Sequence, residues 1–298
     1  MAGTNRIQHS IDHLKGVLRG LSLLTTNRFC TVVACMAVMA LSLPITVFSA
    51  TFAVRISPPN FELKAKPGQV LRHVITLENA DAEVGNYHVR TADWELNDNG
   101  GVVIRPPDQA LPDNSCRPWT RIERRDLTLL PNGKKRYRFE VHVPEDAPDG
   151  ECRFAVVFSQ GTETSDAMEE GNIKVPIVGA IGVIVYVTVG NAAPDLEFKG
   201  AFIDRENESV LPVFRLHNKG NAHARPYGII KIVDSYQKKA ELQISPFPIL
   251  SGQTTDIKLN LIKDLSGIET IDELTLPWQL KGLIEWEGGS YPVETTLE

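Results

Sequence analysis

The sequence predicts an all-β protein that folds into two β-sandwich domains behind an apolar N-terminal segment. After residue 53, short runs of residues alternate between apolar and polar side chains, and helical periodicity is almost absent. Pro, Gly, Asn and Asp interrupt these runs at intervals that suit short strands joined by turns. A charged content of 23% and a hydrophobic content of 42% are those of an ordinary globular protein.

The N-terminal segment has the composition of a signal peptide that covers residues 1–52. Four bases precede an uncharged run over residues 29–50, where Pro44 and small residues come before a cleavage position after Ser49 or Ala53. Because about 20 apolar residues suffice to span a bilayer, the alternative is that residues 29–50 remain as a membrane anchor. Both interpretations predict an exported, periplasmic protein that touches a membrane only through this segment if it is uncleaved.

The charge of the remaining chain bears on its partners. Without the four bases and one acid of residues 1–52, it carries 27 bases and 36 acids, a net charge of −9. Binding to phosphate backbones needs a basic surface. The composition therefore argues against nucleic acid as a partner.

The clearest strand covers residues 136–143. Its apolar side chains alternate with charged or polar ones, so one face is buried and the other faces water. The apolar set is Tyr137, Phe139, Val141 and Val143. Further strands of the first half are expected at residues 54–63, 70–77, 87–94, 102–104, 119–123 and 152–158.

Two cysteines remain once the N-terminal segment, with Cys30 and Cys35, is removed. Cys116 and Cys152 form an even pair, which in an oxidising compartment predicts a disulfide. In the alternating run 152–158, Cys152 shares a face with Phe154, so the bridge is expected to point inward. The alternative is two unpaired, buried thiols.

A long apolar segment over residues 173–189 differs from the other strands because it is apolar on both faces. Such a strand is either buried on both sides or partly uncovered along one edge. An uncovered edge can bind a strand of a partner through backbone hydrogen bonds. The predicted partner-binding side chains are Ile173, Val175, Ile177, Ile181, Val183, Val185 and Val187.

The second half repeats the pattern of the first. Residues 190–194 (GNAAP) interrupt the strands, and new candidates follow at 196–202, 210–217, 228–234, 255–261 and 280–287. Residues 76–81 (TLENAD) correspond to 215–220 (RLHNKG), and 129–135 (LLPNGKK) to 248–254 (PILSGQT). These similarities favour two immunoglobulin-like β-sandwich domains, at residues 53–192 and 193–298.

The sequence lacks the usual signs of an enzyme. It contains none of the common nucleophile, metalloprotease, phosphate-binding or dinucleotide-binding motifs. His217 and His223 flank a loop but have no evident third ligand, and the acids between residues 163 and 170 lie in a stretch expected to be a solvated loop. We therefore expect no enzymatic activity, no cofactor and no metal. Trp94 and Trp119 either stack on glycan or, as is commoner in sandwiches, pack in the core.

The order of the pieces in the first half resembles the PapD-like periplasmic chaperones of pilus assembly. An opening strand (VRISPPNFEL) and a glycine turn precede VLRHVITLENAD, and YHVRTADW follows. RPWTRIERRDLTLLPNGKKRYRFEV and PEDAPDGECRFAVVF then lead to NIKVPIVGAIGVIVYVTVG, which resembles the long subunit-binding strand of that family. The family holds a carboxylate of its pilin with an Arg and a Lys. Residues 57–61 and 177–190 contain neither, so the resemblance does not extend to that anchor.

This resemblance implies a periplasmic chaperone or chaperone-related protein. It would bind an envelope, secreted or pilus-type protein subunit by adding a strand near residues 173–189. The first half also resembles the extracellular domains of WxL-interacting proteins, which bind cell-wall and surface partners. The alternative function is therefore a structural or adhesive envelope protein that binds cell wall, glycan or a neighbouring subunit.

Overall fold

The computed structural model describes residues 53–97, 100–106, 108–160, 167–170, 173–176, 179–206, 209–263 and 267–298. Nearly all regular structure in these ranges is strand, and two short 3₁₀ turns lie at Arg117–Trp119 and Ile271–Glu273. The predicted all-β class, with sandwich-like sheets, is confirmed. The signal-peptide prediction for residues 1–52 lies outside the described residues.

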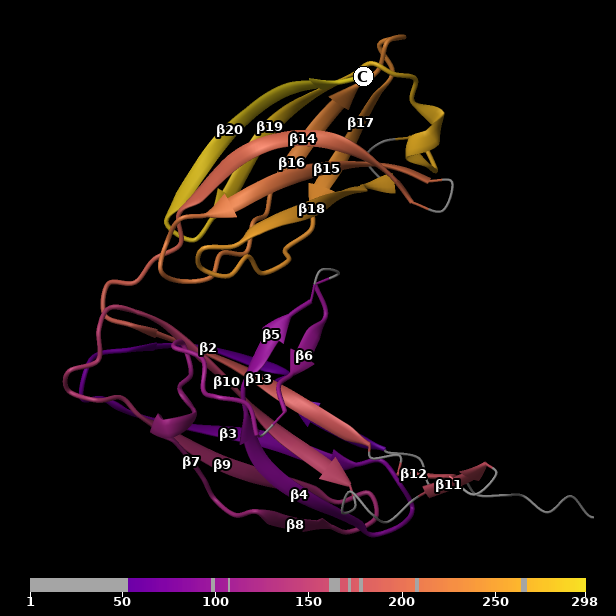
Figure 1. Cartoon of the computed structure of the whole chain (residues 1–298). Helices are drawn as coiled ribbons and strands as arrows, with labels where there is room; N and C mark the ends of the chain where they lie inside the picture. Colours follow the sequence, from indigo (N-terminus) through magenta and orange to yellow (C-terminus); the bar gives the residue numbers. More distant parts are fainter. Residues whose placement is uncertain are drawn as a thin grey trace, which may run out of the picture. The chain divides into compact units, whose positions relative to one another are not determined.

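The first half folds into two antiparallel-dominated sheets (Figure 1). The four-stranded sheet has the order β1 (Val54–Ser57), β3 (Val70–Asn79), β9 (Lys134–His142) and β7 (Thr120–Ile122). The five-stranded sheet has the order β2 (Asn60–Ala65), β13 (Ala180–Val189), β10 (Gly150–Gln160), β4 (Gly85–Ala92) and β8 (Asp126–Leu129). A separate hairpin joins β11 (Ala167–Glu170) to β12 (Ile173–Pro176).

The core of this sandwich lies between the inner faces of the two sheets. Phe139 of β9 meets Phe154 of β10 edge-on, with ring centroids 6.0 Å apart, and Tyr137 meets Phe158 at 5.3 Å. All four rings are almost completely buried. The alternation predicted for residues 136–143 is therefore confirmed, since β9 buries Tyr137 and Phe139 and leaves the intervening residues less buried.

A short hairpin covers the outer face of the five-stranded sheet. It consists of β5 (Trp94–Leu96) and β6 (Val102–Ile104). Trp94 is buried against Tyr186 of β13, and its indole N–H donates to the carbonyl of Phe154 at 3.1 Å. Trp94 is thus a packing residue, and β10 and β13 are covered on both faces.

The second half forms a seven-stranded sheet that folds around its own core. Its order is β14 (Leu196–Glu206), β15 (Ser209–Asn218), β18 (Thr254–Leu261), β17 (Lys239–Ile244), β16 (Ile229–Val233), β19 (Trp278–Trp286) and β20 (Gly289–Leu297). The end strands approach each other, because Phe198 of β14 stacks on Tyr291 of β20 with centroids 5.8 Å apart. Among the described residues, no strand of this sheet pairs with a strand of the first half. The boundary predicted between residues 192 and 193 stays a prediction.

The repeated sequence motif has a structural counterpart. Asn79 ends β3 and Asn218 ends β15, and both side chains are buried. Each amide nitrogen donates to the carbonyl four residues later, of Glu83 at 2.7 Å and of Ala222 at 2.8 Å. Each also donates across the loop, to Leu130 at 3.2 Å and to Ile249 at 2.9 Å. Each amide oxygen accepts from the backbone N–H two residues later.

We expect the substitutions Asn79→Ala and Asn218→Ala each to lower the free energy of unfolding by about 1–3 kcal/mol, because buried carbonyls lose their donors. Denaturant unfolding measures this change. Asn260→Ala is the control, since Asn260 is exposed on β18 and its loss should change stability by less than about 0.5 kcal/mol. Equal, small effects at all three positions would contradict the shared role of Asn79 and Asn218.

Candidate functional site

One edge of the five-stranded sheet is incompletely paired. Strand β13 pairs with β10 along its whole length, from Ala180 to Val189. On its other side β2 pairs with it in parallel only from Ile184 to Val189. Within the described ranges, no strand pairs with that side of residues 180–183.

The backbone groups at this edge point outward in a defined pattern. Gln160 donates its N–H to the carbonyl of Gly179 at 2.9 Å, and Ile184 donates in the opposite direction to Pro59 at 3.3 Å. Because alternate residues of a strand direct N–H and C=O to opposite sides, Ala180 and Gly182 direct theirs to the same side as Ile184. The open edge therefore presents two residues that can both donate and accept.

The path of the N-terminal strands explains why the edge is open. Strand β1 pairs with β3 in the other sheet as far as Ser57. Pro58 and Pro59 follow, and β2 joins the five-stranded sheet only from Asn60 onward. Proline has no N–H to contribute to a ladder. The switch between sheets thus leaves residues 180–183 beside a gap in strand pairing.

The structure distributes the predicted partner-binding residues over different environments. Val183, Val185 and Val187 are completely buried in the core, so their side chains are already occupied. Ile181 is half-buried and packs against the same core. The predicted continuous strand over residues 173–189 is divided, because Ile173 and Val175 lie in β12, which pairs with β11.

Ile177 lies outside the described residues, and the partner-binding role of the whole set stays a prediction.

The stretch that holds the acids between residues 163 and 170 was expected to be a loop, but part of it is a strand. Ala167–Glu170 forms β11, because its backbone pairs in register with Ile173–Pro176.

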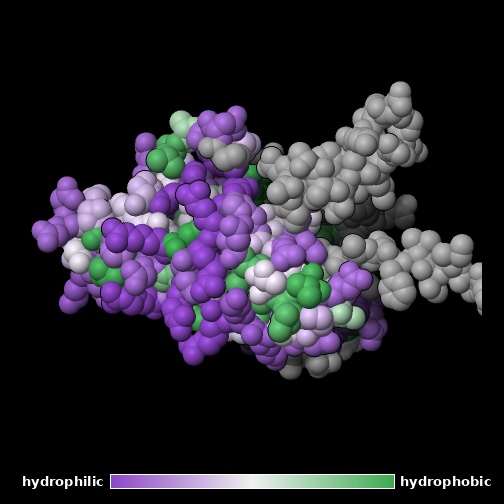
Figure 2. Space-filling view, turned by 90° about the horizontal axis from the view of Figure 1, so that it is seen from below, coloured by the Kyte–Doolittle hydropathy of each residue, from purple (hydrophilic) through white to green (hydrophobic). Residues whose placement is uncertain are grey.

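The outer face beside the open edge is apolar and partly covered. A Cβ built on Gly182 would lie 3.5 Å from the Cδ1 atom of Ile104 in the β5–β6 hairpin. Ile104 and Ile184 pack against the cluster around Trp94 and Tyr186. On the face shown in Figure 2 the described surface is mainly hydrophilic, with separate hydrophobic areas. The candidate site is a backbone edge with apolar neighbours, among them Ile104 and Ile184.

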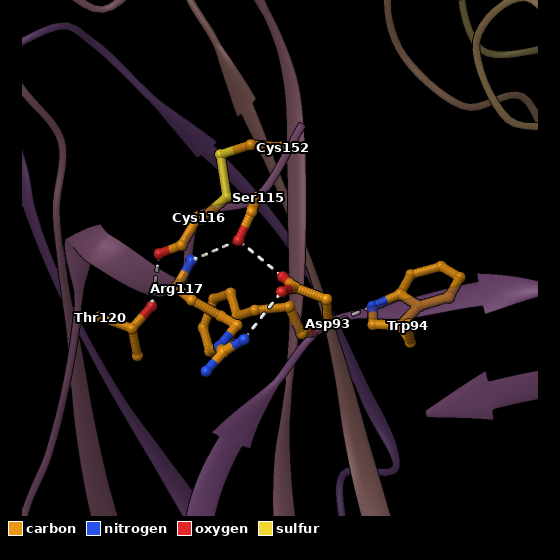
Figure 3. Close-up of a disulfide and its surroundings, with 8 residues drawn as sticks. Asp93, Trp94, Ser115, Cys116, Arg117, Thr120 and Cys152 are labelled. Carbon is orange, nitrogen blue, oxygen red and sulfur yellow. Dashed lines mark hydrogen bonds and ion pairs between the residues drawn. A yellow bond between two sulfur atoms is a disulfide. The ribbon is translucent and has the colours of Figure 1, made fainter. Parts of the chain in front are cut away.

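A disulfide links β10, the strand that pairs with β13, to the segment that precedes β7. Cys116, just before β7, is bonded to Cys152 of β10, with Cα atoms 5.3 Å apart and both side chains buried (Figure 3). The predicted pairing and its inward direction are confirmed. The carboxylate of buried Asp93 accepts from the Ser115 hydroxyl at 2.6 Å and from the Arg117 guanidinium at 2.9 Å, which fixes the residues on both sides of Cys116.

Strand β2, which covers the rest of this side of β13, carries an acid that is paired with basic side chains. Glu62 of β2 accepts from Nε of Arg225 at 2.7 Å, and Nε2 of His223 lies 3.5 Å away. Burial raises the pKa of Glu62, but the hydrogen bond from Arg225 and the charges of His223 and Arg225 outweigh it and hold this pKa below its ordinary value. These bases are thus already paired with an acid of the chain.

Sequence reasoning missed Glu62, and it identified His223 only as a residue that flanks a loop and has no evident third ligand. The side chain of His223 is buried, and it touches two carboxylates that lie far away in the sequence. No local pattern signals such a contact. Among the described residues, no group of three or more His, Cys, Asp or Glu side chains is arranged to hold a metal ion. In the same residues no helix is long and apolar enough to cross a membrane.

Comparison with protein-family models and with curated proteins finds no match. Similar solved structures include the YadV chaperone, at 11% identity and a TM-score of 0.42, covering 82% of this chain and 99% of that one. The class 5 fimbriae chaperone CfaA gives the same four values. The CsuC–CsuE chaperone–tip adhesion subunit complex of Csu pili from Acinetobacter baumannii matches at 12% and 0.40, covering 82% and 98%. With TM-scores below 0.5, the fold and the site of this chain rest on its own strands and contacts.

Loss of the disulfide should destabilise the protein. The bridge links residues 36 apart in the sequence, so the chain-entropy estimate gives a loss of about 3–4 kcal/mol in the free energy of unfolding on reduction. Denaturant unfolding of the oxidised and reduced protein measures it. The double variant Cys116→Ala, Cys152→Ala is the control, because a reductant should leave its stability unchanged. Equal stability of the oxidised and reduced native protein would contradict the expectation.

The ion pairs of Glu62 should make stability depend on acid pH. Since the pKa of Glu62 is depressed in the folded protein, its contribution is present above the ordinary value of 4.5 and is lost as the pH falls through the folded value. We expect the free energy of unfolding to fall less between about pH 6 and about pH 3 in Glu62→Gln than in the native protein. Glu269→Gln, at a highly exposed position, is the control and should keep the native slope. An unaltered slope in Glu62→Gln would disprove the assignment.

Proposed function

We propose that this chain binds an extended segment of an exported or envelope protein subunit, in the manner of a chaperone, by strand addition at the open edge of β13. The observation that carries the proposal is the incomplete pairing of residues 180–183, where Ala180 and Gly182 direct backbone donors and acceptors outward. Strand addition uses such groups for affinity and nearby side-chain contacts for selection.

The size of the edge limits what it contributes alone. Two outward-facing residues make roughly four backbone hydrogen bonds, each worth about 1 kcal/mol net. A total of about 4 kcal/mol corresponds to a dissociation constant of only about 1 mM. Useful affinity therefore requires further contact, and we propose that it comes from Ile181 and Ile104 beside the edge and from residues 173–176, which precede it in the chain.

An exported setting is part of the proposal. The composition of residues 1–52 supports export, and the Cys116–Cys152 bridge is of the kind that persists in oxidising compartments such as the periplasm. The sequence resemblance to the pilus chaperones supports a protein subunit as the guest. A pilin carboxylate held by a free Arg and Lys is not included, because the bases near Glu62 are already paired.

The variant Ala180→Pro tests the edge directly. It removes one outward N–H and leaves the pairing of β13 with β10 intact, because the N–H of Ala180 points away from β10. We expect the affinity for the native partner, captured from periplasmic extract, to fall about fivefold or more while the thermal unfolding midpoint changes little. Ala180→Ser, which keeps the N–H, is the matched control and should bind normally. Val183 and Val185 are unsuitable positions for this test, because Asp in place of either valine would bury a charge in the core.

A second measurement separates the two functional classes. Hydrogen exchange of the Ala180 and Gly182 amides should slow when the captured partner is bound. Equal capture by native protein and Ala180→Pro, together with unchanged exchange, would rule out strand addition at this edge. Binding to isolated cell-wall material that survives Ala180→Pro would favour the structural or adhesive alternative.

A further inference from the structure

A polar cluster lies on the outer face of the five-stranded sheet. Glu62, Tyr186 and Arg153 are directly opposite one another on β2, β13 and β10, and Glu151 lies opposite Thr188 one row further on. Burial raises the pKa of the Tyr186 phenol to about 12, so the ring is neutral. Trp94 packs against Tyr186 and Arg153. The loop 221–225, which connects β15 to β16 of the seven-stranded sheet, contacts the other members of the cluster.

His223 is at the centre of the cluster. Its Nδ1 atom and its backbone N–H both contact the same carboxylate oxygen of Glu151, a side chain that is 1% exposed. Its ring stacks on Tyr186 with centroids 4.0 Å apart, and its Nε2 atom faces Glu62. One imidazole therefore contacts β10, β13 and β2 at once.

Neighbouring contacts extend this attachment. Arg225 binds Glu62 through Nε and lies 5.7 Å from the centroid of the Tyr186 ring. The backbone N–H of Glu151 donates to the carbonyl of Asn221 at 2.9 Å. Leu250, also from the second half, is buried in the apolar cluster of Trp94 and Tyr186.

These contacts differ in kind from those inside each sheet. The cores are apolar and continuous, whereas this attachment adds to the apolar contact of Leu250 a buried carboxylate and its cationic or hydrogen-bonding partners. A buried charge that loses its partner is strongly destabilised in that position. Breaking the His223–Glu151 contact would therefore favour separation of the loop from the sheet, so that water can reach the carboxylate, and would leave both cores packed.

We propose that His223, Arg225, Glu62 and Glu151 form a polar latch that holds the loop 221–225, and with it the seven-stranded sheet, against the outer face of β2, β13 and β10. Release of the latch is a hinge motion between two intact cores. The proposal does not rest on the proposed function, since it requires no guest at the open edge.

The double variant His223→Ala, Arg225→Ala tests the latch in the mature, disulfide-bonded protein. Hydrogen exchange at the Glu151 amide, which donates to Asn221, should become at least about tenfold faster. Amides of Phe154 and Ile230, one in each core, should keep their native protection, and the radius of gyration from small-angle scattering should increase. A variant with Gln in place of Ala at position 223 (His223→Gln) retains a hydrogen-bond donor. It should restore most of the exchange protection of the Glu151 amide.

A matched control removes an Arg elsewhere. Arg215 makes a two-point ion pair with Asp256 on the seven-stranded sheet, so Arg215→Ala should leave exchange at Glu151 unchanged. Native exchange at Glu151 in the double variant would overturn the latch. Loss of protection at Phe154 and Ile230 to the same extent would also overturn it, because His223 and Arg225 would then support the global fold and not a hinge.

Discussion

The antiparallel pairing of β10 with β13 is the constraint on which the rest of the first half depends. It runs without a break from Gly150 opposite Val189 to Ser159 opposite Ala180. The inner faces of both strands fill the sandwich core, and their outer faces are covered by the β5–β6 hairpin and Leu250. The disulfide, the hairpin and the contacts of His223 all attach to this strand pair. The unpaired side of residues 180–183 therefore belongs to a strand pair that is packed on both faces.

Much of the fold follows from local chemistry in the sequence. Period-two alternation predicts β9, β10, β15 and β18, and the two cysteines outside the predicted signal peptide predict the bridge that the structure contains. The repeated Asn motif also has a local cause, because the amide of Asn79 or Asn218 satisfies backbone groups two and four residues later. The motif recurs because β3 and β15 each end in a tight loop, and a carbonyl of each loop accepts a hydrogen bond from the Asn amide.

Other elements depend on contacts that no local pattern records. Strand β20 contains Pro292, which weakens a sequence-based strand assignment, and the structure accommodates it at the end of the sheet, where one side of a strand needs no partner. The apolar run 173–189 is divided because part of it pairs with β11 and part with β10. The apolar pattern does not distinguish a core-facing side chain from one that faces a partner, so the sequence does not reveal that Val183, Val185 and Val187 are buried in the core. The cluster around His223 joins residues about 70 to 160 positions apart.

The brevity of the exposed backbone has a consequence for the behaviour of the protein in concentrated solution. A long, flat, unpaired strand invites identical molecules to add one after another and grow into fibres. Here the accessible stretch ends where β2 begins, beside two prolines that offer no N–H. Copies of this chain have too little ladder to polymerise along it. The unpaired side of residues 180–183 thus keeps backbone groups available while it is too short to serve as a template for stacking copies of this chain.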